Sequence, residues 1–144
     1  MPFTLNDSNF PVVTAIGSKD MSDDNEVTVF HNYWKKLYER KQNFTFILFL
    51  DDVESMQLKI AYMTAKVIKD MKTLPEQYLK KTIVIFKDQL IINIARLLFS
   101  IQSPISQIFL LNSTKNNIKS CIKSILEGNI PDEDIPMYDS CYQK

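Results

Sequence analysis

Two adjacent aspartates followed by a serine come closest to a chemical motif in this chain. Asp51 and Asp52 directly follow an apolar run that ends at Leu50, and Ser55 comes three residues later. Open α/β sheets bind ligands at the carboxyl ends of their strands, and carboxylate oxygens there suit Mg²⁺. Asp52 or Ser55 would also serve as the N-cap of a following helix, which explains the cluster without a metal. We therefore predict Asp51, Asp52 and Ser55 as ligand-binding residues, with no metal site.

A magnesium site of the receiver type would need two further groups. It requires a third acid after the first strand and a lysine after a later strand, and Asp20, Asp23 and Lys87 would have to supply them. An enzyme remains an alternative only if Asp51 and Asp52 hold a metal in this way.

The remaining reactive side chains form no catalytic pattern. His31 is the single histidine and is predicted at a helix surface or boundary. Cys121 is predicted as core packing, whereas Cys141 lies in the tail with Lys144 as its basic neighbour. With only two glycines, the chain lacks the glycine-rich phosphate loops, and no G-x-S-x-G elbow surrounds a serine. We predict no catalytic residue, no cofactor and no enzymatic activity.

The charge balance limits the partners. Seventeen basic and seventeen acidic residues give a net charge of zero, and only Arg40 and Arg96 are arginines. Sequence-specific binding of nucleic acid is therefore not expected. A lysine-rich section nevertheless predicts contact with an anionic surface such as lipid head groups, the alternative being a solvated lysine face. Its residues are Lys66, Lys69, Lys72, Lys80 and Lys81.

Apolar spacing alternates between the period of a strand and that of a helix. Strands are predicted over residues 10–16, 44–50, 82–86 and 107–111. Helices are predicted from Ser22–Asp24 to about Lys41, and over residues 56–71, 89–100 and 112–127. Their predicted N-caps are in residues 22–24, Asp52 or Ser55, Lys87–Asp88, and Asn112 or Ser113, and Gly128 is the predicted C-cap of the last helix.

This order predicts a single α/β domain over residues 1–144, with its core in residues 10–128. The expected architecture is a mainly parallel sheet of four or slightly more strands, with helices on both faces and the order β-α-β-α-β-α-β-α. Residues 129–144 form an acidic tail that either packs along an edge or stays mobile.

The predicted location is intracellular, in the cytoplasm. Residues 1–9 show no signal-peptide pattern, and two cysteines are too few for a secreted disulfide framework. The most apolar stretch, residues 90–111, contains Arg96 and Pro104, so no transmembrane segment is predicted.

Part of the chain resembles a known family. Phe46–Val53 (FILFLDDV) and Leu74–Ile85 (LPEQYLKKTIVI) are similar to the middle of the CRAL-TRIO lipid-binding domain, and residues 130–139 to its BCH-type branch. The similarity spans residues 44–139, although Lys87 begins a segment where the family has an aromatic-proline pair. The element order also resembles the STAS fold of the SpoIIAA-like branch, whose phosphorylated serine would fall near Ser55.

Three functions follow as expectations. The first is a non-enzymatic α/β binding module that acts through protein–protein interaction, as the BCH-type resemblance implies. The second is binding of a lipid or another apolar ligand between the sheet and its helices. The third is a structural subunit of a larger viral or organellar assembly, with which the isoleucine-, lysine- and asparagine-rich composition is compatible.

Overall fold

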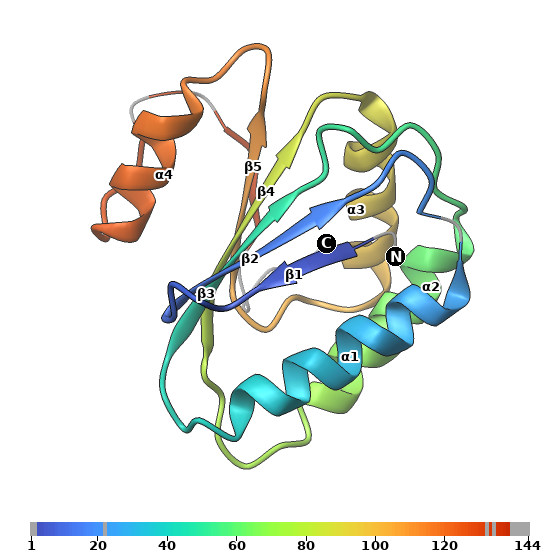
Figure 1. Ribbon diagram of the computed structural model, residues 1–144. Coiled ribbons are helices and arrows are strands. Elements are labelled where there is room, and N and C mark those ends of the chain that lie inside the picture. The colour runs from blue at the N-terminus through green and yellow to red at the C-terminus, as the bar shows by residue number, and fades with distance from the viewer. Residues whose placement is uncertain (1–2, 22, 132, 134, 139–144) are drawn as a thin grey trace.

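One mixed sheet and four helices make up the part of the chain described by the computed structural model, which comprises residues 3–21, 23–131, 133 and 135–138 (Figure 1). The strands are β1 (Phe3–Asn6), β2 (Val12–Gly17), β3 (Phe44–Phe49), β4 (Leu79–Phe86), β5 (Gln107–Asn112) and β6 (Met137–Tyr138). The helices are α1 (Asp24–Tyr38), α2 (Lys59–Met71), α3 (Gln89–Ile101) and α4 (Ile118–Leu126). The α/β class predicted from the sequence is confirmed.

The sheet order follows the chain order from β1 to β6. β2, β3, β4 and β5 pair in parallel, as in the register Val13 with Phe46. β1 and β6 lie at the two edges and pair antiparallel with β2 and β5. Neither edge strand was predicted, because one is four residues long and the other two. The sheet is therefore mixed, with six strands.

The helices cover the two faces of the sheet unequally. Right-handed crossovers between parallel strands that are added in one direction place every helix on the same side. The order of β2 to β5 never reverses, and α1, α2 and α3 accordingly lie together on one face, with α4 on the other (Figure 1). The prediction of helices on both faces therefore holds only in this uneven form.

The larger core lies between the sheet and α1–α3 and contains a group of aromatic rings. Trp34 and Phe44 both pack edge-on against Phe46, with ring centroids 5.9 and 5.2 Å apart. Phe30 lies 5.2 Å from the same ring. Burial of each such side chain contributes about 1.5–3 kcal/mol, so this group anchors α1 to the sheet.

A second, smaller core lies under α4. Ile83, Leu111 and Ile125 are fully buried there. Lys81 lies on the same face and donates from Nζ to the carbonyl oxygen of Ile125 at 2.6 Å, in the last turn of α4. A cation is favourable there, because the last carbonyls of a helix lack partners within it. Ile16 on β2 shares this face and is 47% exposed, beyond the strands that α4 covers.

Two of the predicted helix N-caps are confirmed. Asp23 accepts from the backbone N–H of Asn25 at 2.9 Å at the start of α1, and Asp88 accepts from Leu90 N–H at 3.1 Å at the start of α3. Gly128 follows α4 with φ +87°, which confirms its predicted role at the C-terminal end.

The other two N-cap predictions are wrong. α2 begins at Lys59 after Leu58, with no side-chain cap, so neither Asp52 nor Ser55 starts it. α4 is capped by Asn117, because Asn112 instead closes a turn by accepting from the backbone N–H of Thr114 at 2.9 Å.

The described part of the tail packs along the sheet edge, one of the two predicted outcomes. β6 extends the sheet beside β5. Glu133 accepts from the Nδ2 of Asn116 at 2.9 Å and from the backbone N–H of Asn117 at 3.0 Å. These bonds, with one from Cys121, hold the pKa of Glu133 below its usual value. Cys141 lies outside the described residues.

Candidate functional site

The predicted acidic site is a junction between two loops. Ser55 donates from Oγ to Asp20 Oδ1 at 2.9 Å, and its carbonyl accepts from Met21 N–H at 2.9 Å. Asp51 and Asp52 lie in the turn after β3, at least partly exposed. The structure therefore brings Ser55 to Asp20, one of the acids that a receiver-type site would use. Among the described residues, however, no three histidine, cysteine or acidic side chains are placed to hold a metal.

The sheet order gives no reason to expect a ligand crevice at Asp51 and Asp52. Such crevices form where the strand order reverses and neighbouring helices cover opposite faces. β2 to β5 show no reversal, and neither aspartate lines the cavity found in the structure. Ligand binding by Asp51, Asp52 and Ser55 stays a prediction.

The predicted lysine section divides between two faces of the molecule. Lys66 and Lys69 are exposed on α2, Lys72 directly follows that helix, and Lys80 is exposed near the start of β4. Lys72 donates to Ser103 Oγ at 2.7 Å, and partial burial lowers its pKa. Lys81 does not share this surface, because its Nζ binds the end of α4 on the opposite face.

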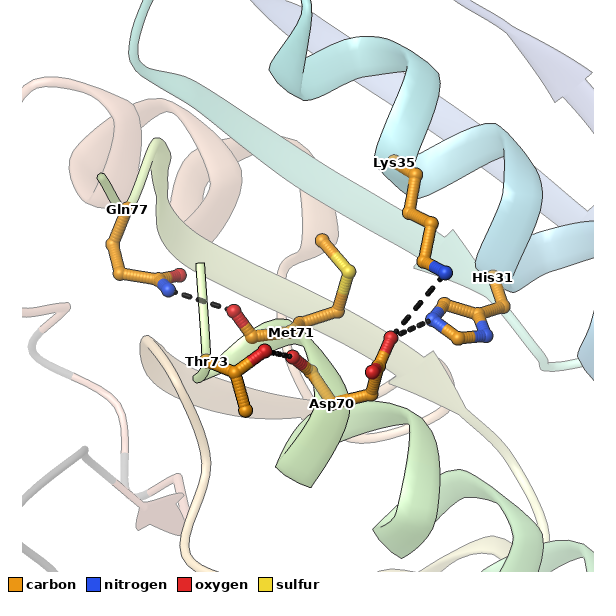
Figure 2. A network of polar contacts seen from close by, with 6 residues as sticks. All are labelled: His31, Lys35, Asp70, Met71, Thr73 and Gln77. Atoms are coloured by element: carbon orange, nitrogen blue, oxygen red, sulfur yellow. Dashed lines mark hydrogen bonds and ion pairs between the residues drawn. The ribbon is translucent and has the colours of Figure 1, made fainter. Parts of the chain in front are cut away.

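A polar network joins α1 to α2 (Figure 2). His31 Nε2 lies 2.9 Å from Asp70 Oδ2, and Lys35 Nζ lies 3.4 Å from the same oxygen. Hydrogen bonding from His31 and then Lys35 lowers the pKa of Asp70. His31 is partly exposed, in agreement with its predicted place at a helix boundary.

The same region closes the C-terminal end of α2. Thr73 Oγ1 donates to the carbonyl oxygen of Asp70 at 2.6 Å, and Gln77 Nε2 donates to that of Met71 at 2.8 Å (Figure 2). Gln77 in turn accepts from the Tyr38 hydroxyl at 2.7 Å. These bonds satisfy helix-end carbonyls and fix the turn before β4, so the network supports the fold.

An apolar cavity of about 190 Å³ lies between the sheet and α1–α3. At one end it is lined by Phe3 and Met21, and at the other by Phe99 and Ile105. It therefore crosses beneath all three helices from the β1 edge towards β5. Apolar side chains dominate its lining, which is the usual character of a small-molecule site.

Glu26 is the ionisable exception in this lining. It is 6% exposed, and its Oε2 has no hydrogen-bond partner among the described residues. The buried Nε1 of Trp34, which also lines the cavity, has no partner there either. Glu26 reaches this position because it precedes Phe30 by four residues and Trp34 by eight on α1, and all three line the cavity. A buried polar group without a partner costs roughly 1–3 kcal/mol, so this carboxyl group requires an explanation.

Two buried hydroxyl groups at the other end of the cavity, by contrast, do have a hydrogen-bond partner. The hydroxyl groups of Thr82 and Ser106 line the cavity and lie 3.0 Å apart, within hydrogen-bonding distance. The lining thus leaves Glu26 Oε2 and Trp34 Nε1 as the buried polar atoms that a bound molecule would satisfy.

Sequence reasoning gave apolar-ligand binding between the sheet and its helices as an alternative, but it named none of the lining residues and missed Glu26, although one signal was present. Glu26 falls on the apolar stripe of the predicted helix, at the spacing of Phe30 and Trp34. A carboxylate on such a stripe is unusual and marks a functional candidate. The volume of the cavity has no counterpart in the sequence, because it depends on how three helices pack.

No protein-family model, curated protein or solved structure matches this chain. The resemblances to the CRAL-TRIO domain and the STAS fold therefore stay predictions. Within the described ranges, every helix is too short or too polar to cross a membrane.

Proposed function

We propose that this chain is a binding protein that holds a small apolar molecule between its sheet and α1–α3. The cavity of about 190 Å³ is the observation that supports this function. An engineered apolar cavity of about 150 Å³ in another protein binds benzene. The present cavity therefore has room for a benzene ring with one or two further heavy atoms.

The energetics favour an occupant. A molecule that fills the cavity gains dispersion contacts with the apolar lining and transfers its own apolar surface out of water.

Toluene is a suitable first probe, because it fits the volume and makes no hydrogen bond. At ten times its dissociation constant it would stabilise the folded protein by about 1.4 kcal/mol, measured as a rise in the thermal midpoint. The variant Ala95→Leu should lose this response, because Ala95 lines the cavity. Ile125→Val changes the second core and should retain it. A wild-type midpoint unchanged by toluene would contradict the proposal.

A second candidate function, contact with an anionic membrane, is favoured by the outer face of α2. Leu58 and Tyr62 are 58% and 52% exposed, one helical turn apart, immediately before the exposed Lys66 and Lys69. Exposed apolar side chains beside lysines suit insertion at a lipid head-group layer, whereas phosphate recognition in nucleic acids favours arginine.

Cosedimentation with vesicles tests this second function. The wild type should bind vesicles that contain phosphatidylserine and not purely zwitterionic vesicles. The double variant Lys66→Glu/Lys69→Glu should lose binding, whereas Lys119→Glu/Lys123→Glu on α4 should keep it, because that pair is exposed on the other side of the molecule. Equal binding by both variants would contradict the assignment to α2.

A further inference from the structure

We propose that the cavity ligand is an apolar amine whose ammonium group binds Glu26. This inference rests on the proposed function and names the chemical class of the ligand. Two observations support it: the size and apolar lining of the cavity, and a buried carboxyl oxygen in that lining without a partner among the described residues.

Glu26 Oε2 has no hydrogen-bond donor among the described residues. None of the other side chains in the cavity lining is ionisable, and the Thr82 and Ser106 hydroxyl groups there bind each other. Trp34 Nε1, the other unpartnered atom of the lining, lies eight residues further along α1. Buried charges in proteins are almost always paired, so a ligand with a donor group is the missing partner.

A cation is a better match than a neutral donor. Glu26 lies in the first turn of α1, where the helix dipole favours a carboxylate. Hydrogen bonds between an ammonium group and a carboxylate are shorter and about twice as strong as neutral ones, most of all away from water. The apolar body of the ligand would then extend from Glu26 along the sheet beneath α2 and α3, whose side chains line the rest of the cavity.

Three probes with the same aromatic ring test the apolar cavity and the carboxyl group of Glu26 separately. Toluene reports on the cavity alone, benzyl alcohol adds a neutral donor, and benzylamine adds an ammonium group at neutral pH. Titration calorimetry on the wild type should show benzylamine binding at least about tenfold more tightly than toluene, the ratio expected from one charged hydrogen bond, and more tightly than benzyl alcohol. This comparison needs no variant.

Glu26→Gln and Glu26→Leu test the assignment to the carboxyl group. Both should retain toluene binding and lose the preference for benzylamine, Glu26→Leu more completely because it removes every polar atom. If toluene binds the wild type and benzylamine binds no more tightly, the role of Glu26 is wrong and the apolar site stands. Persistence of the amine preference in both variants would refute that role too. If none of the three probes binds, the proposed function fails as well.

Discussion

Filling the cavity with a side chain should stabilise the protein. Ala95 on α3 is buried and lines the cavity, so Ala95→Leu would place three more carbon atoms in the void. Burial of each methylene contributes about 0.8 kcal/mol, and leucine is a slightly weaker helix former than alanine. The expected gain in the free energy of unfolding is about 2 kcal/mol, which corresponds to a rise of roughly 4–8 °C in the thermal midpoint.

Ala61 provides a matched control on the neighbouring helix. It is fully buried in α2 but does not line the cavity. The same substitution, Ala61→Leu, adds the same atoms at a fully buried position outside the cavity, and overpacking of this kind costs about 1–3 kcal/mol. The two variants should therefore differ in stability by roughly 3–5 kcal/mol, with opposite signs relative to the wild type.

Urea unfolding followed by circular dichroism measures both variants, with the slope of the transition as a check on two-state behaviour. If Ala95→Leu destabilises the protein as much as Ala61→Leu, the space beneath the helices is absent in solution. The arguments for a ligand would then fail together.

Asp70, Gly128 and Cys121 each predict a further measurable effect. His31 and Lys35 hold the pKa of Asp70 below its ordinary 3.8, so its contribution to stability is complete above that pH and is lost as the pH falls through the lowered value. The free energy of unfolding, measured with urea, should therefore fall less with decreasing pH in Asp70→Asn than in the wild type. An equal fall in the two proteins would contradict the assignment. Gly128→Ala should cost about 1–2 kcal/mol in the same assay, because alanine disfavours φ +87°; a neutral effect would show that this turn relaxes. Burial, together with Glu133, raises the pKa of the Cys121 thiol to about 11, so peptide mass spectrometry should find it unmodified by iodoacetamide at pH 8 in the folded protein and modified in urea.

Local signals predicted the positions of the four central strands and two helix starts well. Asp23 and Asp88 cap helices because each needs only its own next residues to do so. The long apolar runs of β3 and β4 are typical of strands covered on both faces. These features depend on neighbours along the chain, which the sequence contains.

The misplaced caps show where local reasoning fails. Ser55 has the right chemistry for an N-cap, but its hydroxyl group binds Asp20, which is distant in sequence and is brought close by the pairing of β2 with β3. Lys81 belongs by sequence to a lysine-rich section, yet strand alternation directs it to the far face. Tertiary contacts of this kind cannot be read from one segment.

The continuous sheet has a consequence for how any guest molecule would come and go. Backbone hydrogen bonds join each strand from β1 to β6 to its neighbour, so the sheet closes this side of the cavity. A ligand must therefore enter and leave between the helices or at the edges of the space between the helices and the sheet. His31 and Asp70 link α1 to α2. If the ligand leaves between these two helices, the rate of release would be set by how often they separate, and not by diffusion in water.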